Sequence, residues 1–210
     1  MADWNPFKRV ARLREAKPLR PAEIDAQHRI PPGQYRTTKF PVLTYGETPE
    51  ISASAWYLKV WGLVEKPLRL TWEELRALPR QEITCDLHCV TRWSQLDMKW
   101  EGVAFREIAK LVSPKTEARF VMQHCFGGYT TNLPLAELYD DDVLLAYGYD
   151  GAPLARDHGG PLRMLVPKLY LWKSAKWLNG LEFLASDQPG FWEKYGYHNH
   201  GDPWTEERFG

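Results

Sequence analysis

The chain has 210 residues, enough for one domain with a sizeable core, and its 27 basic and 27 acidic residues give a formal net charge of zero. Balanced charge argues against a nucleic-acid or membrane-surface partner. No apolar run approaches the ~18 residues that a membrane span needs.

Cysteine content and the N-terminal sequence bear on the cellular compartment. Three cysteines, an odd number, argue against a disulfide framework and fit a reducing environment. The segment Met1–Arg9 has no apolar core, twin-arginine pair or cleavage site of an export signal. We therefore expect a cytoplasmic protein.

Residues 1–38 are basic, punctuated by proline and weakly periodic, and we expect them to form an extension to a domain at residues 39–210. Two interpretations are open for this extension: a partner-binding arm, or a solvated segment laid over the domain. Its basic side chains include Lys8, Arg9, Arg12, Arg14, Lys17 and Arg20.

The first half of the domain shows clear local signals. Residues 55–64 are aromatic and β-branched, which favours a strand. Thr71 and Glu74 form a capping-box pattern, and Pro79 ends the short helix that follows. Apolar residues alternate with polar ones over residues 83–89, which is typical of a half-buried strand that ends at Cys89.

The second half contains several short elements. Strands with few helices, and without regular alternation of the two, indicate an α+β fold with a mixed sheet in a single domain. No dinucleotide or phosphate-loop motif is present. The expected elements are helices at 104–112 and 134–139 and strands at 118–125, 143–149, 152–154, 161–167 and 180–185.

Cys89 and the residues after it carry the first chemical signal. Thr91, Arg92 and Ser94 supply hydroxyls and a guanidinium, which are groups that hold an oxyanion. A soft thiolate beside such a loop suits a metal that exchanges oxo groups with an oxyanion substrate. The alternative is a small buried apolar residue. Two residues of extended strand cover ~6.6 Å, so Cys85, four residues before Cys89, lies about twice that distance from it. This is too far for the two thiols to share an ion, and we interpret Cys85 as a core residue.

Two cations are candidate phosphate ligands. Arg163 interrupts an apolar strand, and a buried arginine needs an anionic partner that its planar fork can bind. Lys176 follows small residues, Ser174 and Ala175, whose amides can point at an anion. The alternatives are an internal ion pair for Arg163 and a solvated loop for Lys176.

The segment His88–Ser94, with Trp100–Val103 after it, resembles the active-site segment of the sulfite oxidase superfamily. It is most similar to the short bacterial and archaeal members and to catalytic subunits of periplasmic methionine sulfoxide reductases. Gly159–Arg163 and Trp172–Trp177 follow in the family's order and spacing. The resemblance implies the family's mixed-sheet α+β molybdopterin-domain fold and a molybdenum–molybdopterin cofactor (Mo-MPT), with Cys89 as the metal ligand.

The resemblance also implies the surroundings of the cofactor. Cys125 stands at a position that often contacts the cofactor, with a buried structural thiol as the alternative. Arg92 is a candidate catalytic residue on the substrate side, with a surface ion pair as the alternative. His158 stands where some relatives have asparagine. The implied cofactor-binding positions are Val42, Leu43, Cys125, His158, Arg163, Ser174, Ala175 and Lys176.

We therefore expect an oxidoreductase that transfers an oxygen atom, in a two-electron reaction, to or from a small oxo substrate such as sulfite, a sulfoxide or an N-oxide. Because the chain lacks a C-x-x-C-H haem sequence, its electrons would pass through a separate electron-transfer protein.

Other readings remain open for the same residues. One is a non-catalytic carrier of the cofactor. The closely spaced tail residues His198 and His200 either hold a second metal or hydrogen-bond locally. The remaining alternative is a structural zinc protein that uses Cys85, His88, Cys89, His124 and Cys125.

Overall fold

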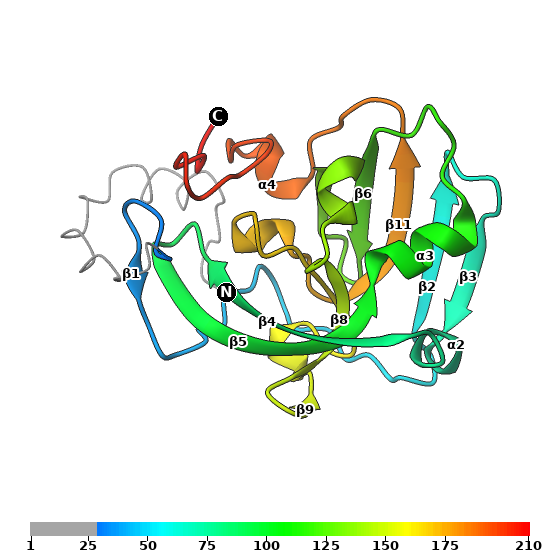
Figure 1. The fold of residues 1–210 in the computed structure, drawn as a ribbon, viewed down its shortest axis with the longest axis horizontal. Coiled ribbons are helices and arrows are strands. Elements are labelled where there is room, and N and C mark those ends of the chain that lie inside the picture. Colours follow the sequence, from blue (N-terminus) through cyan, green and yellow to red (C-terminus); the bar gives the residue numbers. More distant parts are fainter. Residues whose placement is uncertain (1–28) are drawn as a thin grey trace.

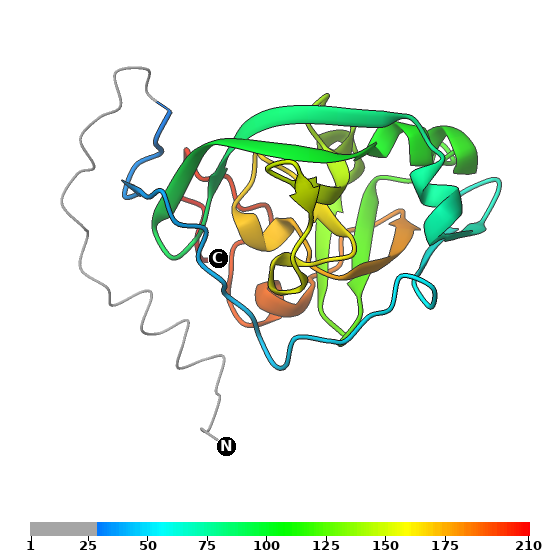
Figure 2. The ribbon, with the colours of Figure 1, turned by 90° about the horizontal axis from the view of Figure 1, so that it is seen from below.

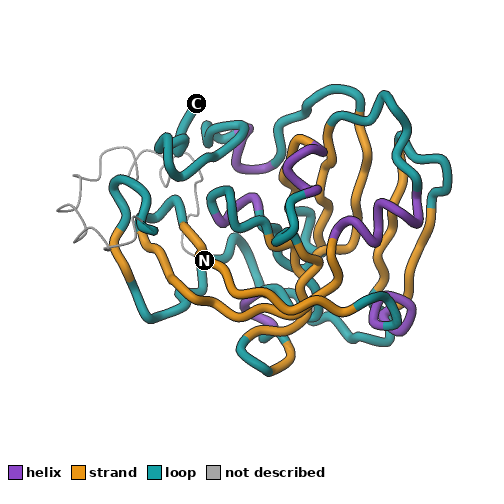
Figure 3. The backbone as a smooth tube through the Cα atoms, viewed as in Figure 1, coloured by secondary structure: helices purple, strands orange, loops and turns teal. Residues whose placement is uncertain are grey.

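A computed structural model describes residues 29–210, in which the strands form two sheets linked by short helices and long loops (Figure 3). Parallel and antiparallel pairings occur in both sheets. This confirms the predicted α+β class, with the strands divided between two mixed sheets. No helix within residues 29–210 is long and apolar enough to cross a bilayer.

The first sheet carries the long curved hairpin that dominates Figure 1. β4 pairs with β5 antiparallel, His88 opposite Ser94, so that residues 89–92 form the connection between them. β1 runs parallel to β5, and β8 continues the sheet on the far side of β5. The strands are β1 (Tyr35–Arg36), β4 (Arg80–His88), β5 (Trp93–Ala104), β8 (Leu144–Tyr149), β9 (Ala152–Pro153) and β10 (Arg163–Leu165).

The second sheet has the order β3-β2-β11-β6-β7 and brings distant parts of the chain together. β11 runs parallel to β2, and Gly62 approaches Phe183 so closely that a Cβ would lie 2.2 Å from the Phe183 carbonyl oxygen. With φ at +90°, only glycine fits there. The strands are β2 (Tyr57–Gly62), β3 (Leu68–Thr71), β6 (Phe120–Cys125), β7 (Thr130–Pro134) and β11 (Leu178–Leu184).

The helices are short and follow local signals. Thr71 accepts a hydrogen bond from the Glu74 amide while its own amide donates to the Glu74 carboxylate, which confirms the predicted capping box of α2 (Trp72–Arg76). α3 (Phe105–Val112) confirms the helix predicted at 104–112. The other helical segments are α4 (Phe191–Lys194) and the 3₁₀ turns η1 (Leu135–Tyr139), η2 (Arg156–His158) and η3 (Leu171–Lys173).

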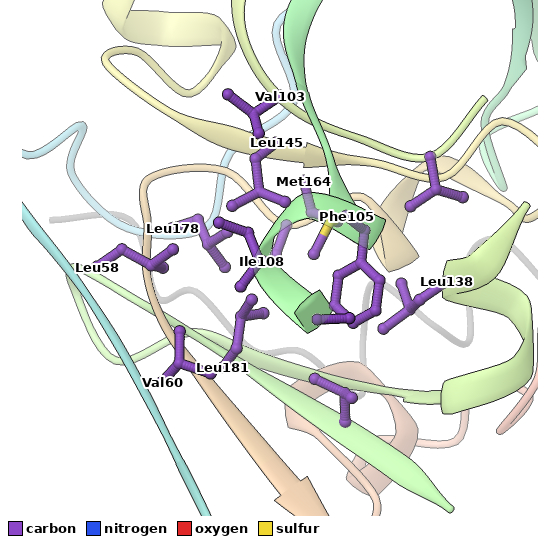
Figure 4. Close-up of a cluster of buried hydrophobic side chains, with 14 of the residues drawn as sticks. Leu58, Val60, Val103, Phe105, Ile108, Leu138, Leu145, Met164, Leu178 and Leu181 are labelled. Carbon is purple, nitrogen blue, oxygen red and sulfur yellow. The ribbon is translucent and has the colours of Figure 1, made fainter. Parts of the chain in front are cut away.

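The main core takes side chains from both sheets and from α3. Figure 4 shows Leu58 and Leu181 of the second sheet facing Ile108 of α3, with Val103 and Leu145 of the first sheet above them. Each of these side chains is fully buried. Burial of one such side chain stabilises the fold by about 1.5–3 kcal/mol, so this core holds the two sheets together.

A second, aromatic cluster lies around Cys89. It contains Val90 and Trp93 from the β4–β5 hairpin, with Tyr170, Trp172, Trp192 and Tyr197 from the C-terminal third of the chain. Figure 2 shows the C-terminal segment running beside the loop that precedes β1, near this end of the hairpin. The C-terminal residues therefore pack against the cysteine segment.

Three strands differ from the sequence prediction. We expected a polar loop after Cys89, but β5 begins at Trp93 and runs to Ala104. β3 and β7, which are both short, were also not predicted. Most of the predicted extension 1–38, including its basic side chains up to Arg20, lies outside the described residues, while residues 35–36 form β1.

Candidate active site

One pocket opens where the β4–β5 connection, η2 and η3 meet. It spans about 850 Å³ when the open solvent at its mouth is included. Its walls are largely aromatic. The lining residues lie in the segments 40–45, 89–91, 158–163 and 171–177, together with Tyr129, Trp192 and Tyr197.

Cys89 lines this pocket at the first position after β4. The Arg92 amide donates to the Cys89 carbonyl at 2.9 Å, and the Cys89 amide donates to the Trp93 carbonyl at 2.9 Å, which closes a tight turn. Arg92 adopts a φ of 75° to complete it. The Thr91 hydroxyl donates to the Cys89 sulfur at 3.1 Å. The turn thus presents a thiol with one hydrogen bond already directed at it.

Arg163, on β10, lines the pocket and is 1% exposed. Its guanidinium donates to the carbonyls of His158 at 2.9 Å, Ser174 at 2.8 Å and Met164 at 3.3 Å. Burial lowers its pKa to about 10. Within residues 29–210 it makes no ion pair with a carboxylate, so an anion in the pocket would compensate a charge that the described protein leaves unmatched.

Lys176 is the second cation of the pocket. Its ammonium donates to the carbonyls of Asp157 at 2.6 Å and Leu43 at 3.1 Å and to the Thr44 hydroxyl at 3.2 Å. Burial, with a smaller contribution from Arg163, lowers its pKa to about 7. These partners are neutral acceptors, and no carboxylate of the described chain pairs with Lys176. The pocket therefore has two cations that favour a bound anion.

His158 lies between these cations and the aromatic wall. Its ring stacks on Phe40 with centroids 3.8 Å apart. Burial, and then the charges of Lys176 and Arg163, lower its pKa to about 4. The ring is neutral near pH 7, and its buried Nδ1 has no hydrogen-bond partner among residues 29–210. Such an atom is suited to a polar group of a ligand.

Comparison with known proteins shows the family to which the chain belongs. Residues 45–192 match the family described as oxidoreductase molybdopterin binding domain, and this range includes Cys89, Arg163 and Lys176. The chain belongs to the sulfite oxidase family of molybdopterin-binding oxidoreductases. The predicted family and enzyme class are confirmed.

Relatives within the family differ in length and name. The uncharacterized oxidoreductase YuiH of Bacillus subtilis is 48% identical over 188 residues, which cover 89% of this chain and 95% of YuiH. The catalytic subunit MsrP of a protein-methionine-sulfoxide reductase from Campylobacter jejuni is 28% identical, with 70% of this chain and 54% of MsrP covered. Arabidopsis thaliana sulfite oxidase is 29% identical, with 65% and 44% covered. The chain thus spans about half the length of these last two relatives.

A solved structure supports the fold. The sulfane dehydrogenase SoxCD of Paracoccus pantotrophus aligns with a TM-score of 0.61 and 25% identity, covering 66% of this chain and 40% of the SoxCD chain. The two-sheet arrangement is therefore the molybdopterin-domain fold that the sequence predicted.

The pocket residues fit the family's cofactor on structural grounds alone. A pterin with a phosphate would meet one buried and one partly buried cation, neither with a carboxylate partner, and one imidazole nitrogen without a hydrogen-bond partner among the described residues. A metal that prefers sulfur ligands would meet the Cys89 thiol. The pocket therefore has a thiol for the metal of the family's molybdenum–molybdopterin group, and cations and an imidazole for its pterin and phosphate.

Six of the eight predicted cofactor-binding residues line the pocket, and two do not. Leu43, His158, Arg163, Ser174, Ala175 and Lys176 all line the pocket. Val42 precedes Leu43 but is not among the lining residues, and its side chain is exposed. Cys125 sits in the main core, where burial raises the pKa of its thiol.

The amides of Ser174 and Ala175 do not face a ligand as the sequence suggested. The Ser174 amide donates to the Leu171 carbonyl at 3.1 Å, and the Ala175 amide donates to the Gln123 side chain at 3.3 Å. The Ser174 hydroxyl accepts from the Val166 amide at 2.9 Å. These two residues shape the pocket wall, and their backbone donors are already used.

Arg92 does not line the pocket, whereas Thr91 does. Sequence reasoning also missed most of the aromatic wall, because its members come from distant segments without a shared spacing. The high tryptophan and tyrosine content was the available signal. The missed aromatic lining residues are Phe40, Tyr45, Tyr129, Trp172, Trp177, Trp192 and Tyr197.

The zinc alternative has no support in the described part of the chain. No group of three or more His, Cys, Asp or Glu side chains within residues 29–210 is arranged to hold a metal. His88 shares a hydrogen bond with Ser94, and His124 with Glu182.

The tail histidines bond locally. His200 lies between the carboxylates of Glu137 and Glu207, at 3.1 Å and 3.0 Å, and His198 lies 3.2 Å from Glu207. This favours the local hydrogen-bonding interpretation over a second metal site.

Proposed function

We propose that this chain binds molybdenum through Cys89 and catalyses two-electron oxygen-atom transfer on a small oxo compound. The observation that carries the proposal is the placement of one thiol, the buried Arg163 and the partly buried Lys176, both cations without carboxylate partners, in a single pocket. When bound, the molybdenum–pterin group supplies a metal that can give or take an oxo group.

Cys89 supplies the protein's soft ligand in this proposal. The turn at residues 89–92 fixes its backbone, and the aromatic cluster of Trp93, Trp172 and Tyr197 shields it from bulk water. The Thr91 hydroxyl withdraws electron density from the sulfur through its hydrogen bond. These contacts set the position and electronic character of the ligand before any substrate arrives.

Arg163, Lys176 and His158 hold the cofactor in place. Arg163 and Lys176 offer charge-assisted donors to a phosphate, and the neutral His158 offers Nδ1 to a pterin polar atom. Arg163 also bonds the His158 and Ser174 carbonyls, so one guanidinium orients two neighbours of the cofactor. We propose that loss of Arg163 weakens cofactor retention more than it alters chemistry on retained cofactor.

The substrate side is assigned to Thr91, which lines the pocket next to Cys89. Its single hydroxyl proton bonds the Cys89 sulfur in this structure, and it would have to turn to an oxo or oxyanion group to stabilise negative charge that develops there. The sequence-based role of Arg92 would require its guanidinium to reach the same space, and its side chain lies outside the lining. The aromatic walls leave little room for bulk, which favours sulfite, sulfoxides and N-oxides over larger compounds.

A separate protein would exchange electrons with this chain. The names of two relatives support this part of the proposal, because one is a catalytic subunit and another a putative subunit of a protein-methionine-sulfoxide reductase. The exposed residues Leu43 and Tyr45 flank the pocket mouth, where a partner would come near the cofactor.

The test is a steady-state assay of protein produced in a molybdate-replete host. Sulfite with an artificial acceptor, and sulfoxides and N-oxides with an artificial donor, are the substrates to compare. We expect turnover of at least one class and a lower kcat/KM in Thr91→Val. Turnover only by carbon hydroxylation or dehydrogenation would refute oxygen-atom transfer. Molybdenum-replete protein without any turnover would favour the carrier alternative.

A further inference from the structure

Two residues outside the matched family range hold the turn that carries Cys89. The Gln34 side-chain amide donates to the Cys89 carbonyl at 3.1 Å, and the Arg208 guanidinium donates to the Val90 carbonyl at 2.9 Å. Both side chains are buried, at 1% and 5% exposure. Since the family match covers residues 45–192, these donors belong to the two terminal segments of the described chain.

The buried guanidinium of Arg208 contacts mainly uncharged groups. A second nitrogen of its fork donates to the Pro32 carbonyl at 3.3 Å, and its guanidinium carbon lies 4.9 Å from the Tyr170 ring centre. The nearest carboxylate, on half-exposed Glu206, is 3.8 Å away. A buried charge with so little direct compensation destabilises the fold. Its presence beside the turn at residues 89–92 therefore indicates a role other than packing.

The charge of Arg208 reaches Cys89. Its guanidinium bonds the carbonyl of Val90, the residue next to Cys89. Burial and the charge of Arg92 lower the pKa of Arg208, while Tyr170, Glu206 and the Cys89 sulfur act on it in the opposite direction. Arg92 also lies close, because a Cβ on Gly33 would stand 3.3 Å from an Arg208 nitrogen and 3.5 Å from an Arg92 nitrogen. Two guanidinium groups therefore lie close together beside the turn, with one carboxylate next to them, because the same Cβ would stand 2.6 Å from a Glu206 oxygen.

We propose that Arg208 is a positioning residue that fixes the Cys89 turn and raises the reduction potential of the metal bound there. This inference rests on the proposed function, since it requires molybdenum on Cys89. A fixed positive charge near a metal favours its reduced, less positive state. The fork bonded to Val90 and Pro32 keeps that charge at a constant distance from the thiolate.

Two substitutions separate charge from geometry. Arg208→Gln removes the charge and keeps a side-chain amide donor, whereas Arg208→Lys keeps the charge but replaces the planar fork with a compact ammonium. Arg106→Gln is the matched control, because Arg106 is an exposed arginine on α3 that pairs with Asp141 at the protein surface. The readouts are the midpoint potential of molybdenum in a redox titration followed by electron paramagnetic resonance, and the molybdenum and pterin content.

The expected result is a lower midpoint potential in Arg208→Gln, a value near wild type in Arg208→Lys, and no change in Arg106→Gln. An unchanged potential in cofactor-loaded Arg208→Gln would overturn the inference and leave the proposed function standing. If Arg208→Gln does not fold, Glu206→Gln removes the neighbouring carboxylate and should raise the potential, and an unchanged value overturns the inference. Wild-type protein without molybdenum would overturn both.

Discussion

The Lys173 ammonium lies 2.7 Å from the Glu193 carboxylate, with both side chains withdrawn from solvent. The same carboxylate oxygen accepts hydrogen bonds from the Trp172 indole at 3.0 Å and the Thr131 hydroxyl at 2.8 Å. Because Trp172 and its neighbour Trp192 line the pocket, this buried pair holds the aromatic wall from behind.

Lys173→Met should destabilise the fold by about 3–5 kcal/mol, since it leaves a buried carboxylate without its cation. Urea denaturation measures the change. Lys173→Met combined with Glu193→Gln removes both charges and should recover part of the loss.

The matched control for this prediction is Lys110→Met, which breaks an exposed pair with Glu107 and should cost about 0.5 kcal/mol or less. Point substitutions typically change the free energy of unfolding by about 1 kcal/mol. A free energy of unfolding for Lys173→Met within ~1 kcal/mol of the control would therefore contradict a buried ion pair.

Lys176 should make anion binding depend on pH. With its pKa lowered to about 7 by burial, Lys176 is charged below that value and neutral above it. Sulfate, which keeps its charge over this range, should therefore raise the Tm of cofactor-free protein more at pH 6 than at pH 8.5.

Sulfate also stabilises proteins generally, so the comparison needs a variant. Lys176→Met should remove the difference between the two pH values, whereas Lys66→Met, at an exposed turn, should retain it. Equal protection of the wild type at both pH values would argue against Lys176 as an anion ligand.

Arg163→Met should lower cofactor content and stability together. The substitution removes a charge-assisted donor to the cofactor, at a cost on the order of 2–5 kcal/mol, and also releases the His158 and Ser174 carbonyls. Pterin and molybdenum analysis of the purified variant provides the measurement. The exposed Arg119 serves as control through Arg119→Met. Full cofactor content in Arg163→Met would assign it a structural role only.

The stability of the fold in acid should depend on Glu137, which pairs with Lys168 and the tail residue His200. Burial would raise the pKa of Glu137, but hydrogen bonds from Lys168 and His200 outweigh it and lower the pKa. Glu137 thus contributes stability above its ordinary pKa and loses it as the pH falls through the lowered value. Glu137→Gln should flatten the loss of stability in acid, as measured by urea denaturation from pH 6 to pH 3. An unchanged slope would contradict the prediction.

Local signals in the sequence predicted the elements that one stretch of chain determines. The capping box at Thr71, the helix at 104–112 and the neighbouring strands at 143–149 and 152–154 all depend on near neighbours. β5 was missed because its alternation is irregular: Asp97 has a φ of 58°, and the register with β8 shifts at Gly102. Its pairing with three other strands is a long-range property.

The candidate site divides in the same way. Three site residues carry local signals in the sequence: Cys89 ends an alternating strand, Arg163 interrupts an apolar one, and Lys176 follows two small residues. Gln34 and Arg208 carry no such signal, since each becomes part of the site only when the terminal segments meet the turn at residues 89–92. The amides of Ser174 and Ala175 show the opposite case, because a local pattern suggested donors that the fold uses elsewhere.

The most direct test of the central claim is the sulfur count at molybdenum by X-ray absorption spectroscopy. Cys89 ligation predicts that Cys89→Ser keeps the pterin but loses one sulfur neighbour of the metal, while Cys85→Ser, on the preceding strand, keeps the wild-type count. An unchanged count in Cys89→Ser, or a wild-type protein that holds stoichiometric zinc in place of molybdenum, would contradict the assignment of Cys89.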